Sequence, residues 1–250
     1  MRILHKVFIF IGLFSLAFFL LRNSEYYTTK LLFSDFGGIT WLYSAIGIIF
    51  SIIAAFTIQK EWEQWNNLVD AVKSEVDALE ELRLWSVHFP AKIKSKFHTA
   101  IRNYLKIVIQ EEWTRSEKNE ECDMTGQSLD LFHDAFFEIF DKKPELMTAS
   151  FTIFTDVLRY RGQRIHYINR HMPLILRRTL VLAVNLVIFL SLFIAVKSIW
   201  LDYIFTLSIA VLTYTVYLVI DDLEHPLRPG GWHLTRKDYQ CLLDKINSQN

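Results

Sequence analysis

Three long stretches without a charged side chain constrain this chain more than any other feature. No Asp, Glu, Lys or Arg occurs in residues 36–59, 179–196 or 203–220. A helix needs about 20 apolar residues to cross the ~30 Å hydrocarbon core of a bilayer. The sequence therefore predicts a membrane protein and excludes an entirely soluble globule. A hydrophobic content of 52% also excludes disorder, and a formal net charge of +0 gives no general attraction to nucleic acid.

A shorter uncharged run, residues 7–21, follows Arg2 and Lys6 near the N-terminus. A secretory signal peptide has the same features. The sequence FLLRNS at positions 19–24, however, lacks the small residues of a cleavage site. We therefore favour a retained helix over about 3–21, because Lys6 can extend its side chain to the interface.

These patterns predict an all-α polytopic membrane protein with four transmembrane helices. Glycine is rare between the second and third spans, where only Gly126 and Gly162 occur, and this favours a helical domain there. The predicted organisation is 1–58 for transmembrane helices 1 and 2, 59–178 for a cytoplasmic helical domain, 179–220 for a transmembrane hairpin, and 221–250 for a cytoplasmic tail.

Basic residues near the spans predict the orientation in the cell membrane. One side would hold Arg22, Lys30 and Lys197, and the other Arg2, Lys6, Lys60, Arg170, Arg177, Arg178 and Arg228. Basic residues in short loops are retained in the cytoplasm. Both termini are therefore expected to be cytoplasmic. Cys122 and Cys241 then lie in a reducing compartment, where neither a disulfide nor a metal site is expected.

The second span is expected to continue as a helix beyond the membrane, because no Pro or Gly follows Gly47 for many residues. Apolar residues recur there at steps of three and four, which is typical of a helix packed on other helices: Trp62, Trp65, Val69, Val72, Val76 and Leu79. The other face is mostly acidic and includes Glu61, Glu63, Asp70 and Glu75. A solvated face is the simpler interpretation, and a surface that faces passing ions is the alternative.

Further helices are expected after Pro90 and on both sides of Pro144, with a polar loop at 111–126. The helix that ends near Arg170 also carries Arg159, Arg161 and Arg164. We expect these arginines to approach anionic lipid.

A search for catalytic or metal-binding motifs favours no enzyme. The sequence has no HExxH pair, no phosphate-binding glycine loop and no nucleophile elbow. No cofactor and no metal are therefore expected. The spans also lack a charge at mid-membrane depth, which argues against a proton-coupled carrier.

One apolar stripe on the second span has two interpretations. Ile48, Ile52 and Phe56 recur every four residues. By default such a stripe contacts lipid or a neighbouring helix. If several subunits surround an axis, the same stripe forms a constriction that gates by dewetting.

The second span and its continuation carry the sequences WEQWNNL at 62–68 and AVKSEVDAL at 71–79, and the fourth span ends in DLEHPL at 222–227 followed by Gly230. Together these segments resemble the bestrophin-like family of membrane proteins, which are distant relatives of the bestrophin ion channels. The resemblance covers nearly the whole chain in order and spacing. It marks Asp221, Asp222, Glu224 and Pro226 as the motif that follows the fourth helix.

The resemblance implies a pentameric ion channel whose second helix lines the pore. Placing Trp65 on the tryptophan motif of the bestrophins puts Ile48, Ile52 and Phe56 on the three positions of the hydrophobic neck. Animal bestrophins carry a dense acidic calcium-binding run after the fourth helix, whereas this chain has only Asp221, Asp222 and Glu224 there. Calcium gating is therefore not expected.

Two functions remain open at this stage. The first is a homo-oligomeric, pentameric channel that passes inorganic ions through the bilayer, with cations slightly favoured by Glu61, Glu63, Asp70 and Glu75. The alternative is a helical membrane scaffold or regulator that recruits a cytoplasmic partner through the domain at 59–178.

Overall fold

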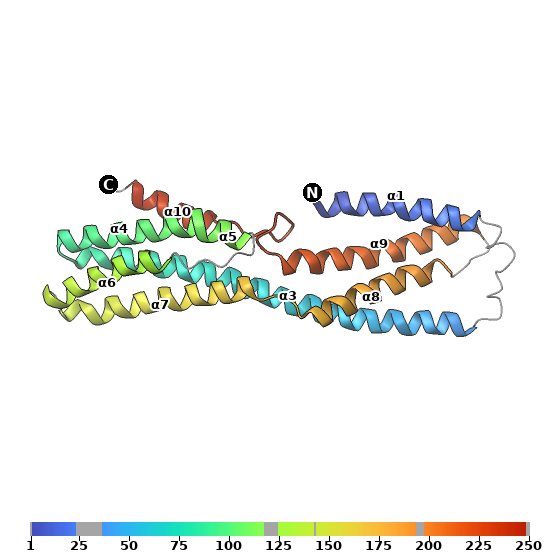
Figure 1. The fold of residues 1–250 in the computed structure, drawn as a ribbon, viewed down its shortest axis with the longest axis horizontal. Coiled ribbons are helices and arrows are strands. Elements are labelled where there is room, and N and C mark those ends of the chain that lie inside the picture. Colours follow the sequence, from blue (N-terminus) through green and yellow to red (C-terminus); the bar gives the residue numbers. More distant parts are fainter. Residues whose placement is uncertain (1, 24–36, 118–124, 143, 194–197, 249–250) are drawn as a thin grey trace. The chain divides into compact units, whose positions relative to one another are not determined.

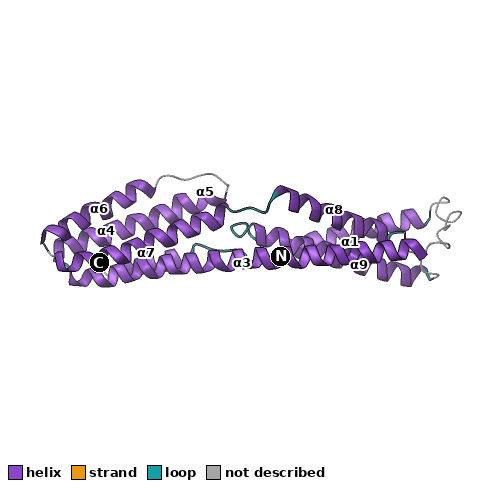
Figure 2. Ribbon diagram, turned by 90° about the horizontal axis from the view of Figure 1, so that it is seen from below, coloured by secondary structure: helices purple, strands orange, loops and turns teal. Residues whose placement is uncertain are grey.

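The computed structural model describes residues 2–23, 37–117, 125–142, 144–193 and 198–248. Every regular element in these ranges is a helix (Figure 2). Four helices are long and apolar enough to cross a membrane, with spans at Ile3–Arg22, Trp41–His88, Leu174–Ser191 and Ile199–Glu224. The predicted all-α class and the number of membrane spans are confirmed.

The chain folds into two compact units. The first unit comprises Met1–Glu63 and His171–Trp232, and the second comprises Gln64–Arg170 and His233–Asn250. Helix α3, Gly37–Trp85, contributes residues to both. Its length agrees with the predicted continuation of the second span, since no Pro or Gly interrupts the helix after Gly47.

The first unit contains α1 (Arg2–Arg22), the first part of α3, α8 (Leu174–Ser191) and α9 (Ile199–Glu224) (Figure 1). Helix α9 packs against both α1 and α8. The buried cluster takes Phe50 and Ala54 from α3, and it also contains Met172, Leu180, Val184, Val187 and Ile220.

Helix α8 begins earlier than the uncharged run at 179–196 predicts. Pro173 is its N-cap, and the carbonyl of Pro173 accepts a hydrogen bond from the Arg177 amide at 3.1 Å. The first turns therefore include Arg177 and Arg178, which a search for uncharged residues leaves out. The structure moves the start of the third span to Leu174.

The second unit packs its helices around an aromatic core. Its elements besides α3 are η1 (Ser86–His88), α4 (Ala91–Ile107), η2 (Val108–Glu112), α5 (Trp113–Glu117), α6 (Thr125–Lys142), α7 (Pro144–Asn169) and α10 (Lys237–Asn247). The rings of Phe97 and Phe132 lie 6.2 Å apart, and those of Phe132 and Phe154 lie 5.1 Å apart. These pairs join α4, α6 and α7.

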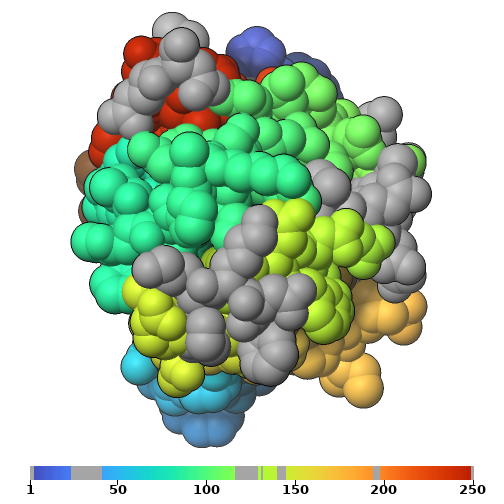
Figure 3. Space-filling view, turned by 90° about the vertical axis from the view of Figure 1, so that its left-hand side faces the viewer, coloured from blue at the N-terminus to red at the C-terminus, as the bar shows by residue number. Residues whose placement is uncertain are grey.

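Helix α10 brings the end of the chain back to this unit. It packs against α4, and the red C-terminal segment lies beside green α4 in Figure 3. Tyr239, Leu242 and Ile246 are buried, at spacings of three and four that form one helical face.

The polar loop predicted for 111–126 is wrong at both ends, and α6 already begins at Thr125. Residues 111–117 are helical, because the π-helical turn η2 continues directly into α5. Glu112 is only 2% exposed and Trp113 only 1%. The polar sequence indicated an exposed loop, but Glu112 is buried because two arginines pair with its carboxylate. Cys122 lies outside the described residues.

Candidate functional site

The stripe of Ile48, Ile52 and Phe56 lies on the outside of α3. These side chains are 62%, 64% and 65% exposed. The opposite face of the helix carries Phe50 and Ala54, which are 8% and 3% exposed and belong to the buried cluster. Helix α3 therefore presents its apolar stripe away from the unit that holds it.

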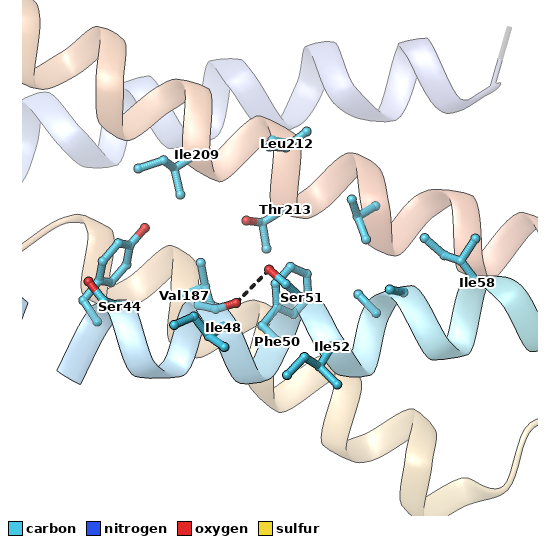
Figure 4. A pocket seen from close by; sticks show the side chains of 15 residues that line it. Ser44, Ile48, Phe50, Ser51, Ile52, Ile58, Val187, Ile209, Leu212 and Thr213 are labelled. Atoms are coloured by element: carbon cyan, nitrogen blue, oxygen red, sulfur yellow. Dashed lines mark hydrogen bonds between the residues drawn. The ribbon is translucent and has the colours of Figure 1, made fainter. Parts of the chain in front are cut away.

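An apolar groove adjoins this stripe. It has a volume of about 650 Å³ and lies between α3 and α9, with Val187 contributed by α8 (Figure 4). Ile48 and Ile52 line it together with Ile209 of α9. The Ser51 hydroxyl donates to the Gly47 carbonyl at 2.8 Å, so it is already bonded within its own helix. The groove contains no charged lining residue, and its surface suits hydrocarbon or another apolar helix rather than an ion.

The four acidic candidates on α3 divide into two exposed and two buried residues. Glu63 is exposed and bonds Lys60 at 3.3 Å, and Asp70 is also exposed. Glu61 is only 4% exposed and Glu75 is 0% exposed. Only Glu63 and Asp70 are therefore carried forward as carboxylates that can face an aqueous pathway.

Glu75 lies inside the second unit, in a charge network that sequence reasoning missed. Arg164 of α7 donates from Nε to one Glu75 oxygen at 2.7 Å and from Nη2 to Glu112 at 2.7 Å. The Tyr104 hydroxyl donates to Glu75 at 2.6 Å. Arg161 adds a second positive charge beside Glu112 at 2.9 Å. The network thus has two carboxylates and two guanidinium groups, so its formal charges cancel.

Burial and charge shift the pKa values within this network. Burial raises the pKa of Tyr104 well above its ordinary value, and the negative charge of Glu75 adds to the rise. Burial alone would lower the pKa of Arg164, but the adjacent Glu75, Tyr239 and Glu112 raise it well above its ordinary value. Arg164 is therefore a permanent cation, and its ring neighbour Tyr239 lies 5.8 Å from the guanidinium carbon.

The expected lipid contacts of the α7 arginines are wrong for two of them. Arg161 and Arg164 are committed to the buried carboxylates, and Arg164 is only 1% exposed. Arg159 pairs with Asp156 at 3.0 Å on the surface. Arg170, the residue after α7, is exposed, and its backbone carbonyl accepts a hydrogen bond from the Gln64 side chain at 2.6 Å.

The apolar seam predicted along α3 is only partly right. Val72 and Leu79 are buried as predicted, whereas Trp62 is 43% exposed. The buried face in the second unit also contains Leu68, Glu75 and Leu82. The steps of four, three, four and three from Leu68 to Leu82 contain Glu75, so this spacing was the one signal in the sequence for its burial.

The acidic motif predicted to follow the fourth helix lies instead in the last turn of α9, where groups of the chain itself bind it. Asp221 lies 3.5 Å from Arg177 and 3.8 Å from Lys6, and Glu224 lies 3.6 Å from Arg177. Asp222 accepts backbone N–H groups from the turn at 225–232, which contains Pro226. Among the described residues no cluster of three or more His, Cys, Asp or Glu side chains is suited to a metal ion.

At the other end of the membrane helices, Arg22 of α1 pairs with Asp202 of α9, and both side chains are largely buried. Lys30 and Lys197, the other basic residues predicted for that side, lie outside the described residues. The pair joins the first and last membrane helices near the ends that the predicted orientation would place outside.

Comparison with known proteins identifies the class of this fold. Residues 35–229 match the Bestrophin-like domain family. The chain therefore belongs to the bestrophin-like family, as its sequence motifs indicated. Comparison with curated proteins gives no match.

Solved structures share the fold over the full length of the chain. A tryptophan-to-alanine variant of a bacterial bestrophin homolog from Klebsiella pneumoniae is 13% identical, with a TM-score of 0.76 and coverage of 99% of this chain and 98% of that chain. A structure of a bacterial bestrophin homolog from the same organism, solved by Zn-SAD phasing, is 13% identical, with a TM-score of 0.74 and coverage of 98% and 97%. At this identity the likeness shows the fold alone.

Proposed function

We propose that this chain assembles into a homo-oligomer, a pentamer as in the bestrophins, and conducts ions passively along an axis lined by α3. The observation that carries the proposal is the exposure of Ile48, Ile52 and Phe56, at 62–65%, on a helix whose opposite face is buried. In a family of ion channels, an exposed apolar stripe of this kind suits the lining of an axis that several subunits share.

In this account the three apolar residues of every subunit form the neck. A narrow apolar constriction excludes water until it widens, so it gates ions without any charged group. The absence of charge from residues 36–59 fits this mode of gating better than binding of an ion at the neck.

A slight preference for cations follows from Glu63 and Asp70, two of the exposed carboxylates on α3 beyond the neck. Lys60 and Lys73 on the same helix weaken that preference. The orientation that we propose places both termini and the second unit in the cytoplasm, with the chain in the cell membrane.

A pair of phenylalanine substitutions tests the neck. Phe56→Ala removes a ring that is 65% exposed on α3, and Phe8→Ala removes one that is 70% exposed on α1. In potassium-loaded liposomes, F56A should raise potassium efflux because a wider neck stays wet, while F8A should match the unchanged protein. A monomeric protein, or no ion flux at any voltage, pH or calcium level, would overturn the proposal.

The scaffold function keeps one supporting observation. Val87, Phe137 and Phe151 of the second unit are 60%, 61% and 53% exposed, which favours contact with another chain. A stoichiometric complex with a different cytoplasmic protein through these residues, together with no ion flux, would favour the scaffold. A complex of identical chains favours the channel.

A further inference from the structure

The turn that follows α9 folds back onto the last turn of that helix. One oxygen of Asp222, Oδ2, accepts hydrogen bonds from the backbone amides of Gly231 at 2.7 Å and Trp232 at 3.3 Å. Bonds to an ionised acceptor are about twice as strong as neutral ones. A single carboxylate on α9 therefore fixes where the turn ends.

Two adjacent glycines meet this carboxylate at different distances. A Cβ atom at Gly230 would lie 1.8 Å from Oδ1 of Asp222 and 2.6 Å from its Cγ. A Cβ atom at Gly231 would lie 3.4 Å from Oδ2, which is an ordinary contact. A side chain at 230 would therefore push the Asp222 carboxylate out of its place, whereas one at 231 would not.

The fixed turn places Trp232 against the helix that carries the neck stripe. The rings of Trp232 and Trp62 lie 6.1 Å apart in an edge-to-face arrangement, with an interplanar angle of 88°. Trp62 follows Phe56 on α3 by about 9 Å along the helix axis. Both partners belong to the first unit.

We infer that Asp222 is a positioning residue for α3, acting through the Gly230 turn and the contact of Trp232 with Trp62. The inference rests on the proposed channel function and names a contact that controls it. The adjacent acids have other partners, because Asp221 and Glu224 bind Arg177. Asp221 also meets His225 at the start of the turn, at 3.9 Å. Asp222 instead bonds the amides of Gly231 and Trp232 at the end of the turn, and so connects α9 to the residue that contacts α3 near the neck. Loss of this contact frees the middle of α3, next to the neck, and favours the closed, dry neck.

The two glycines give a matched test in liposomes loaded with potassium. Gly230→Ala should lower potassium efflux about tenfold, the effect expected when a hydrogen bond to a charged group is lost. Gly231→Ala should leave efflux unchanged. Single-channel recording should show a lower open fraction for G230A at the same unit conductance, which a purely structural role would not produce.

A second variant covers the case in which G230A does not assemble. Trp232→Ala keeps the hydrogen bonds of the turn, because they use the backbone amide, but it removes the ring that contacts Trp62. It should lower the open fraction as G230A does, and combining it with Trp62→Ala should add nothing further. Trp200→Ala, at a side chain that is 68% exposed elsewhere on α9, is the control and should leave the open fraction unchanged.

The outcomes separate this inference from the channel proposal. Equal open fractions for the unchanged protein, W232A and, where it assembles, G230A would overturn the positioning role while leaving the channel intact. An unchanged protein that conducts no ions would overturn the channel function itself.

Discussion

The two parts of α3 differ in which side chains they bury and which they expose. In the first unit both faces of the helix are apolar, with Phe50 and Ala54 buried and Ile52 exposed. In the second unit the outer face is polar, as at Asp70, while the inner face contains the buried carboxylate of Glu75. In the first part of α3 polarity does not distinguish the buried face from the exposed one, because both faces are apolar. In the second part it does so for most residues but not at Glu75, whose charge is buried because Arg164 pairs with it.

The largest effect on stability is expected when the cation that pairs with the buried carboxylates is removed. Arg164→Ala leaves Glu75 and Glu112 buried without their shared cation, and breaking such a pair costs about 3–5 kcal/mol. We expect a correspondingly lower free energy of unfolding in denaturant titrations of the protein in detergent. Arg159→Ala, at an exposed pair with Asp156, is the control and should cause no measurable change. Equal effects of the two substitutions would contradict the assignment of Glu75 to the core.

A smaller effect on the free energy of unfolding is expected for Glu80, which pairs with Arg83 and Lys245 near the surface of the second unit. The hydrogen bond from Arg83 lowers the pKa of Glu80 from 4.5 to about 2, burial opposes this shift, and Lys245 of α10 adds to it. Because the folded-state pKa is depressed, the stabilisation is complete above about pH 4.5 and is lost as the pH falls towards 2.

Acid titration of stability checks this contribution of Glu80. The free energy of unfolding of Glu80→Gln should fall less steeply than that of the unchanged protein between pH 4.5 and 2. At pH 7 the variant should be slightly less stable, since Arg83 and Lys245 lose their charged partner. Parallel curves for the two proteins would show that the pair contributes nothing.

Much of the fold could be predicted because it depends on local signals. The uncharged runs predict four spans, and the absence of Pro and Gly after Gly47 predicts the length of α3. The start of α8 could not be predicted from those runs, because Arg177 and Arg178 belong to the helix although they are charged.

The candidate site was only partly predictable, because its polar contacts are remote in sequence. The Glu75 carboxylate is matched by an arginine 89 positions away, and no local pattern reveals that pairing. Glu112 was hidden in a polar stretch that looks like a loop. The spacing of Ile48, Ile52 and Phe56 predicts the stripe. Its exposure could not be predicted, because it depends on which face of α3 packs against the other helices.

The central claim, that the exposed stripe of α3 faces a wet axis, is tested most directly by cysteine accessibility. Ile52→Cys is made in a protein whose Cys122 and Cys241 are replaced by Ser, and Leu13→Cys on α1 is the control, since both side chains are 64% exposed. A charged, water-soluble thiol reagent is added to each protein in potassium-loaded liposomes. We predict that the reagent modifies I52C and changes potassium efflux, while L13C remains unmodified in lipid. An unreactive I52C in a conducting protein would contradict the account.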